Sequence, residues 1–236
     1  MTTHKIGTRE EWLAARKALF AKEKELTHMR DAIGAERRAL PWVKLDKSYV
    51  FDSTAGKVSL ADLFEGRSQL HVQHFMFGPD WKQGCPGCSF MADHVDAARQ
   101  HFEHNDLSFV AVSRASVDQI EAYKRRMGWT FNWVSSLGSD FNYDFHVSFK
   151  RAELDAGPVE YNFKREKLDG EEQHGESLFF KDTDGTIYHT YSSYSRAGED
   201  LIGAYRFLDL APLGRNEGAD GTMMKWMRRH DEYGRQ

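Results

Sequence analysis

Cysteine is scarce in this sequence. Among 236 residues it occurs only as Cys85 and Cys88, within the run CPGC. Two cysteines cannot form the disulfide framework of a small secreted domain. Because they stand together and no third cysteine is present, three interpretations arise: a redox-active dithiol, part of a metal site, or two inert thiols.

Long apolar segments and a strong charge of one sign are also lacking. No apolar run approaches the roughly 20 residues that a helix needs to span a bilayer. The first residues carry charges without the apolar stretch of a signal peptide. The net charge of -4 gives no electrostatic reason to expect a nucleic-acid or membrane partner. With 40% hydrophobic and 29% charged residues, the composition is typical of a globular protein, and we expect a cytoplasmic location.

Residues 8–40 are predicted to form an N-terminal helical extension. Thr8 and Glu11 match a capping box, and apolar residues recur at near-helical spacing until Pro41 ends the pattern. Thr27 is a point at which this helix could bend or divide. A long charged helix gains most of its stability by packing an apolar stripe. We therefore expect residues 1–40 to cover either a second copy in a homodimer or the domain of residues 41–236, the chain forming one globular unit overall.

Beyond the extension, patterns of strand and helix alternate. The predicted elements are extended pieces at 42–45 and 49–51, a short helix at 59–64, a strand at 70–77, a helix at 89–104, a strand at 107–112, a helix at 117–127, a strand at 130–134, a hairpin of 177–181 with 186–190, and a helix at 197–207. A loop-rich insertion at 136–172 precedes the hairpin. This order predicts an α/β protein with a thioredoxin-like three-layer α/β/α fold.

The CPGC run follows a predicted strand and begins a predicted helix, where open α/β sheets place their chemistry. The N-terminus of a helix stabilises a thiolate, and Pro86 suits the first helical turn. Cys88 lies three residues after Cys85 on the same helix face, close enough for a disulfide after a modest adjustment. The spacing therefore indicates that Cys85 attacks as a thiolate and that Cys88 resolves the intermediate, without a cofactor.

Four neighbouring residues are expected to support this site. Trp81 and Lys82 stand in the loop before the motif, and Pro86 and Gly87 lie inside it. For Trp81 the alternative is that it only packs the loop. Free cysteines are often buried and inert, so a non-catalytic binding module with structural thiols is the alternative function.

A metal site is disfavoured. His101 and His104 follow the cysteines, but their spacing is shorter than in Cys2His2 zinc sites. In a continuous helix His101 would also lie about 20 Å along the axis from Cys88. Attachment of a c-type haem is excluded because Ser89 stands where that motif requires histidine. We expect neither a metal nor a cofactor.

Other polar residues have no spacing that ties them to Cys85. His74 is interpreted as a strand residue and His94 as a solvated helix residue. The charged, aromatic tail from Trp226 to Tyr233 is expected to dock on the domain.

Several runs together resemble one family. They are LPWV at 40–43, HFMFGPDW at 74–81, GCPGCSF at 84–90, RRMGW at 125–129, GSDFN at 138–142 and RHDEY at 229–233. The sequence is similar, over about residues 10–233, to the bacterial domain-of-unknown-function family 899, which is described as thioredoxin-like predicted dithiol-disulfide oxidoreductases. The resemblance implies a thioredoxin-like fold and chemistry on a thiol or disulfide of a protein or small molecule.

The sequence departs from better-known thioredoxin-like proteins. Gly84 stands where thioredoxins usually carry tryptophan, and no proline precedes the hairpin strand in the run from Gly175 to Leu178. The Pro-x3-Thr-x2-Cys loop of peroxiredoxins is also missing, since Pro79 stands six residues before Cys85 with no threonine between them. A thiol-dependent peroxidase is therefore kept only as an alternative.

Overall fold

The computed structural model describes residues 4–217 and 225–234 and divides the chain into two units, Met1–Pro41 and Trp42–Gln236. The first unit contains one uninterrupted helix, α1 (Arg9–Arg38), which begins with the predicted capping box of Thr8 and Glu11. Thr27 does not interrupt α1, and its hydroxyl donates to the carbonyl of Glu23 at 3.0 Å within the helix. The packing of this helix, on a second copy of the chain or on the domain of residues 41–236, stays a prediction.

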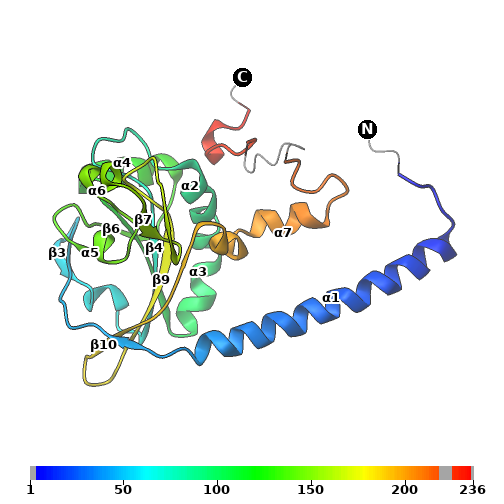
Figure 1. Cartoon of the computed structure of the whole chain (residues 1–236), viewed down its shortest axis with the longest axis horizontal. Coiled ribbons are helices and arrows are strands. Elements are labelled where there is room, and N and C mark those ends of the chain that lie inside the picture. The colour runs from blue at the N-terminus through cyan, green and yellow to red at the C-terminus, as the bar shows by residue number, and fades with distance from the viewer. Residues whose placement is uncertain (1–3, 218–224, 235–236) are drawn as a thin grey trace. The chain divides into compact units, whose positions relative to one another are not determined.

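The second unit is built around one mixed sheet (Figure 1). Its strands are β1 (Val43–Lys44), β2 (Val50–Ser53), β3 (Gly56–Ser59), β4 (Gln69–His74), β5 (Leu107–Ser113), β6 (Asn132–Ser135), β9 (Gly175–Lys181) and β10 (Ile187–Tyr194). Their order is β1-β10-β9-β4-β5-β6-β2-β3. Strands β4, β5 and β6 are parallel, whereas β9 pairs antiparallel with both β4 and β10.

Alternation along the strands gives the sheet two apolar faces. In β5, Val110 and Val112 join one buried cluster, whereas Phe109 and Ala111 join the other. The second cluster includes residues of α2 (Pro86–Ala92), α3 (Val95–His104) and α4 (Val117–Met127). Helices α2 and α3 connect β4 to β5, and α4 connects β5 to β6. Both connections are right-handed and run in the same direction across the sheet, so the three helices lie on one face.

The opposite face is covered by shorter elements. The short 3-10 helix η1 (Asp62–Phe64) and the helices α5 (Phe141–Asp144) and α6 (Arg151–Ala156) contribute buried residues to the first cluster. The sheet is thus enclosed on both faces, and the chain has the predicted thioredoxin-like α/β fold. Helix α4 and the hairpin of β9 with β10 lie where the sequence predicts them.

The prediction of one helix over 89–104 was wrong. The chain forms α2 and α3 with a break at Asp93 and His94. The ring Nδ1 of His94 bonds the carbonyl of Phe90 at 2.8 Å, which is the acceptor that the His94 amide would use in a continuous helix. That amide donates to the carbonyl of Met91 instead. His94 therefore lies partly buried at the break between the two helices and is not the solvated helix residue that the sequence predicts. Its Nε2 accepts from the amide of Ala204 at 3.0 Å.

Other boundaries also differ from the predictions. The short helix expected at 59–64 is η1 alone, and the helix expected at 197–207 is a 3-10 segment, η2 (Ser195–Leu201), followed by α7 (Gly203–Leu210). Strand β3 was not predicted. The insertion is less loop-rich than expected, since it holds α5, α6 and a separate two-stranded sheet of β7 (Val159–Tyr161) and β8 (Lys164–Glu166).

Candidate active site

Both cysteines lie where the end of β4 meets α2. Cys85 is the N-cap residue of α2, and Pro86 occupies the first helical position. The amide of Cys85 donates to the carbonyl of Met76 at 3.0 Å, and the amide of Met76 donates to Cys88 Sγ at 3.4 Å. Cys88 is 2% exposed, whereas Cys85 is only partly buried. The fold thus places one thiol at the surface of the site and the other behind it.

The two thiols have opposite pKa shifts. The Cys88 thiol donates a hydrogen bond to Cys85, and with the amides of Cys88 and Gly87 and the charge of Arg229 it lowers the pKa of Cys85 to about 6. Burial and the hydrogen bond to Cys85 raise the pKa of Cys88 well above its ordinary value. The helix N-terminus was expected to lower the pKa of Cys85, but the largest contribution comes from the Cys88 side chain.

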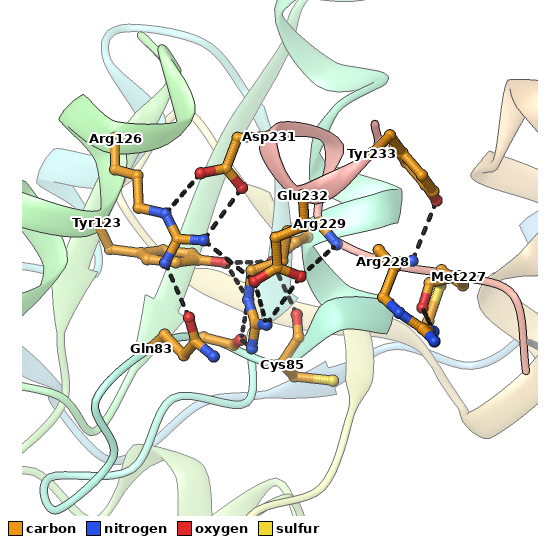
Figure 2. Close-up of polar contacts among 12 residues, drawn as sticks. Gln83, Cys85, Tyr123, Arg126, Met227, Arg228, Arg229, Asp231, Glu232 and Tyr233 are labelled. Carbon is orange, nitrogen blue, oxygen red and sulfur yellow. Dashed lines mark hydrogen bonds and ion pairs between the residues drawn. The ribbon is translucent and has the colours of Figure 1, made fainter. Parts of the chain in front are cut away.

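Arg229, in the C-terminal tail, supplies a positive charge close to Cys85 (Figure 2). It is 8% exposed, and its guanidinium donates through Nη2 to the carbonyl of Gly84 at 2.5 Å and through Nε to the hydroxyl of Tyr123 at 3.0 Å. The hydroxyl of Tyr123 lies 2.8 Å from Ser89 Oγ, which donates to the carbonyl of Cys85 at 2.7 Å. Arg229 is therefore part of a hydrogen-bond network that extends through Tyr123 and Ser89 to the backbone carbonyl of Cys85.

Side chains around Arg229 hold this part of the tail. The guanidinium of Arg126 binds Asp231 at 2.7 Å and Gln83 at 2.8 Å, and so joins the tail to the loop before Cys85 (Figure 2). Glu232 pairs with Arg229 at 3.2 Å. The described part of the tail thus docks on the domain as expected, and it brings a buried arginine to the dithiol, which no sequence pattern indicates.

Gly84 is required by close packing at this point. A Cβ at residue 84 would lie 2.6 Å from the ring of Phe75 and 2.9 Å from the ring of Tyr123. Neither ring can move far in a closely packed core. This contact explains why the thioredoxin tryptophan has no counterpart before Cys85.

A cavity of about 310 Å³ lies beside both cysteines. Its lining residues are Met76, Cys85, Gly87, Cys88, Met91, Tyr161, Gln173, His174, Ser195, Arg196, Glu199 and Ile202. Of the four predicted supporting residues, only Gly87 is among them. Pro86 begins α2, Lys82 is exposed, and Trp81 packs against the second buried cluster, as the alternative interpretation has it.

Three further findings concern the described residues. A larger hollow of about 600 Å³ beside α5 and α6 contains neither cysteine. Within residues 4–217 and 225–234, no group of three or more His, Cys, Asp or Glu residues is placed to hold a metal ion. No helix in this part of the chain is long and apolar enough to cross a membrane.

His174 and Glu176 are further polar residues behind the dithiol that the sequence argument missed. His174 Nδ1 lies 3.8 Å from Cys88 Sγ, and Glu176, on β9, is 2% exposed. A signal was present in the sequence, because an acidic residue within an otherwise buried strand is rarely without a specific role.

The chain therefore has a thioredoxin-like fold with a pair of cysteines at the start of α2. The sequence model of DUF899, described as "Bacterial protein of unknown function", matches residues 1–233, and the chain belongs to this family. No curated protein matches the sequence significantly.

Similar solved structures are peroxiredoxins. Peroxidoxin BcpB from Mycobacterium tuberculosis is 16% identical, with 72% of this chain and 96% of that chain covered and a TM-score of 0.44. A PrxQ mutant from Xylella fastidiosa is 16% identical, with 69% and 89% covered and a TM-score of 0.42. The mitochondrial 2-Cys peroxiredoxin from Plasmodium falciparum is also 16% identical, with 75% and 98% covered and a TM-score of 0.40. Likenesses of this degree say nothing about the reaction.

Alkylation of Cys85 is expected to depend on pH with a midpoint near 6. The thiolate is the reactive species, so the rate should rise as the pH passes through the lowered pKa and level off above it. Cys88 should stay unmodified in the folded protein, because it is buried and its pKa is raised. Iodoacetamide labelling followed by mass spectrometry measures both rates, with the urea-unfolded chain as the control, where a free cysteine has a pKa of about 8.5. A midpoint for Cys85 as high as in the unfolded chain, or a more acidic Cys88, would contradict this arrangement.

Proposed function

We propose that the protein is a dithiol-disulfide oxidoreductase in which Cys85 attacks a substrate disulfide and Cys88 resolves the mixed disulfide. The observation that carries the proposal is the asymmetry of the pair. A partly exposed thiol with a lowered pKa is backed by a buried thiol that donates a hydrogen bond to it. If both thiols were only structural, a lowered pKa would not be expected at Cys85, because an inert buried cysteine has a raised pKa.

The reaction balances over two exchanges. The Cys85 thiolate attacks one sulfur of the substrate disulfide, the substrate S–S bond breaks, and the first thiol leaves. Cys88 then loses its proton and attacks Cys85 Sγ, so that the bond from Cys85 to the substrate breaks and the second thiol leaves. The substrate gains two electrons from the protein, one proton from Cys88 and one proton from solvent, and the protein is left with a Cys85–Cys88 disulfide. A thiol reductant returns it to the dithiol.

The surroundings of Cys85 support a small or extended substrate. The thiol is partly buried and faces a cavity of about 310 Å³, at the low end of the volumes of small-molecule sites. Met76, Met91 and Ile202 give part of its lining an apolar character. We therefore propose a low-molecular-weight disulfide, or a disulfide in an extended peptide, in preference to one in a folded protein.

The test is whether the pair cycles and turns over a disulfide. Mass spectrometry after alkylation, at graded ratios of reduced to oxidised glutathione, should show Cys85 and Cys88 oxidised together, within the range of about -120 to -270 mV spanned by known dithiol proteins. With dithiothreitol as reductant, the protein should reduce a small disulfide faster than it reduces the disulfides of insulin. The rate of reduction of cumene hydroperoxide tests for peroxidase activity. A pair that never oxidises in this range would favour the binding module, and faster turnover of the hydroperoxide would favour a peroxidase.

A further inference from the structure

The side of Cys88 that faces the sheet carries a row of buried ionisable side chains. His174 Nδ1 lies 3.8 Å from Cys88 Sγ, and the opposite ring nitrogen, Nε2, lies 3.6 Å from Glu176 Oε1. The other carboxylate oxygen, Oε2, hydrogen bonds to Nε2 of His71 on β4. The row therefore runs from Cys88 through His174 and Glu176 to His71.

The chain positions these groups by strand pairing. In the register of β4 with β9, Gly175 stands opposite His74 and Glu176 opposite Gln73, so His174 comes just beyond the end of β4, beside α2. The hydroxyl of Tyr161 donates to the carbonyl of His174 at 2.8 Å and fixes its backbone. These restraints hold the ring of His174 between Cys88 and Glu176.

Within the described part of the chain, two atoms of this row have no hydrogen-bond partner. They are His174 Nε2 and Glu176 Oε1, which face one another. Buried polar atoms without partners are rare in folded proteins and need a specific explanation. A positive charge on His174 would draw these two atoms together, which suggests that the row is built for a state in which His174 carries an added proton.

We propose that His174 takes the proton of Cys88 when Cys88 attacks the mixed disulfide, that Glu176 positions and stabilises the charged ring, and that His71 connects the row to solvent. This inference rests on the proposed function. In the balanced step, the Cys88 proton moves to His174 Nδ1, the new S–S bond forms to Cys85, and the bond from Cys85 to the substrate breaks. The departing thiolate is then protonated by solvent or by His174.

The electrostatics of the row fit this role. Burial lowers the pKa of His174, so the ring is neutral near pH 7. In the tautomer that has its hydrogen on Nε2, the nitrogen that faces Glu176, Nδ1 can accept the proton of Cys88. The His71 side chain is 14% exposed, and His71 and Glu176 both line a second cavity, of about 210 Å³. The ionisable groups that face His174 are Cys88 from α2, Glu176 from β9, His71 and His74 from β4, and Tyr161 from β7. Arg196 and Glu199 from η2 line the same cavity as His174.

The experiment separates the two exchanges in the full chain. Reduced protein is mixed with 2,2′-dipyridyl disulfide, and each exchange releases one thiopyridone that is followed by absorbance. His174→Gln should change the rate of the first phase, which reports the attack by Cys85, by no more than about twofold. It should slow the second phase by about 10- to 100-fold near pH 7, as expected for the loss of a general base. Glu176→Gln should slow only the second phase, and less severely. His189→Gln is the matched control, because His189 is a partly buried histidine of the same sheet that bonds Ser192 and not Cys88.

The pH profile distinguishes a catalytic from a structural role. In His174→Gln the rate of the second phase should rise about tenfold per pH unit, because hydroxide must then deprotonate Cys88. In the unaltered protein the rate of this phase should stay nearly level between about pH 7 and 9. A level profile in the variant, or equal slowing of both phases, would overturn the role of His174. If the variant does not fold, a tenfold rise per pH unit in the unaltered protein would overturn it equally. Release of only one thiopyridone by the unaltered protein, without a Cys85–Cys88 disulfide, would instead overturn the proposed function and this inference with it.

Discussion

Cys85→Ser is expected to lower the rate of disulfide reduction to the uncatalysed background, a loss of roughly a thousandfold or more. The serine hydroxyl keeps the size and place of the thiol but is not ionised near neutral pH, so no nucleophile forms at the N-cap of α2. The variant should fold, because residue 85 is only partly buried and its backbone hydrogen bonds do not involve the thiol. Turnover of a small disulfide with dithiothreitol measures the effect.

Cys88→Ser is the matched comparison for this prediction. It retains Cys85 and the first exchange, but the mixed disulfide has no resolving thiol behind it, so the substrate half should remain attached and be visible by mass spectrometry. If Cys88→Ser lost the first exchange and Cys85→Ser retained it, the two roles would be reversed. Equal activity of both variants and the unaltered protein would show that the thiols are not catalytic.

Arg229→Met is expected to weaken both the fold and the reactivity of Cys85. Methionine keeps an apolar stem but leaves the carbonyl of Gly84 and the hydroxyl of Tyr123 without the donor that now serves them. Unsatisfied buried polar groups cost about 1–3 kcal/mol each, so the free energy of unfolding should fall by about 2–4 kcal/mol. Because Arg229 helps to hold the Cys85 pKa low, this pKa should rise and alkylation at pH 6 should slow severalfold. Urea unfolding and alkylation rates measure the two effects.

Arg126→Met is the control for Arg229. Arg126 binds Asp231 in the same tail, but its side chain is 35% exposed and does not reach Gly84. A surface ion pair of this kind contributes about 0.2–1 kcal/mol, so only a small loss of stability and an unchanged Cys85 pKa are expected. If the two variants behaved alike, the charge of Arg229 would have no particular effect on Cys85.

The accuracy of the sequence predictions followed the range of the interactions that form each element. Helix α4 was predicted with its correct bounds, because Ser116 caps its start and Gly128, with a positive φ of 68°, ends it within the chain segment itself. The helix break at His94 was missed, because its ring nitrogens bond Phe90 in α2 and Ala204, which is 110 residues away. The local pattern at 89–104 has neither glycine nor proline to mark that break.

The sequence by itself determined where the two thiols stand relative to one another. Cys85 and Cys88 are three positions apart at a helix start that Pro86 favours, so the local chain brings them together. The tertiary structure alone decided what surrounds the pair. Arg229 reaches Gly84 across 145 residues and His174 reaches Cys88 across 86 residues. No periodicity or spacing encodes such contacts, because they depend on the path of the insertion and on the pairing of β4 with β9, which only the packed core fixes.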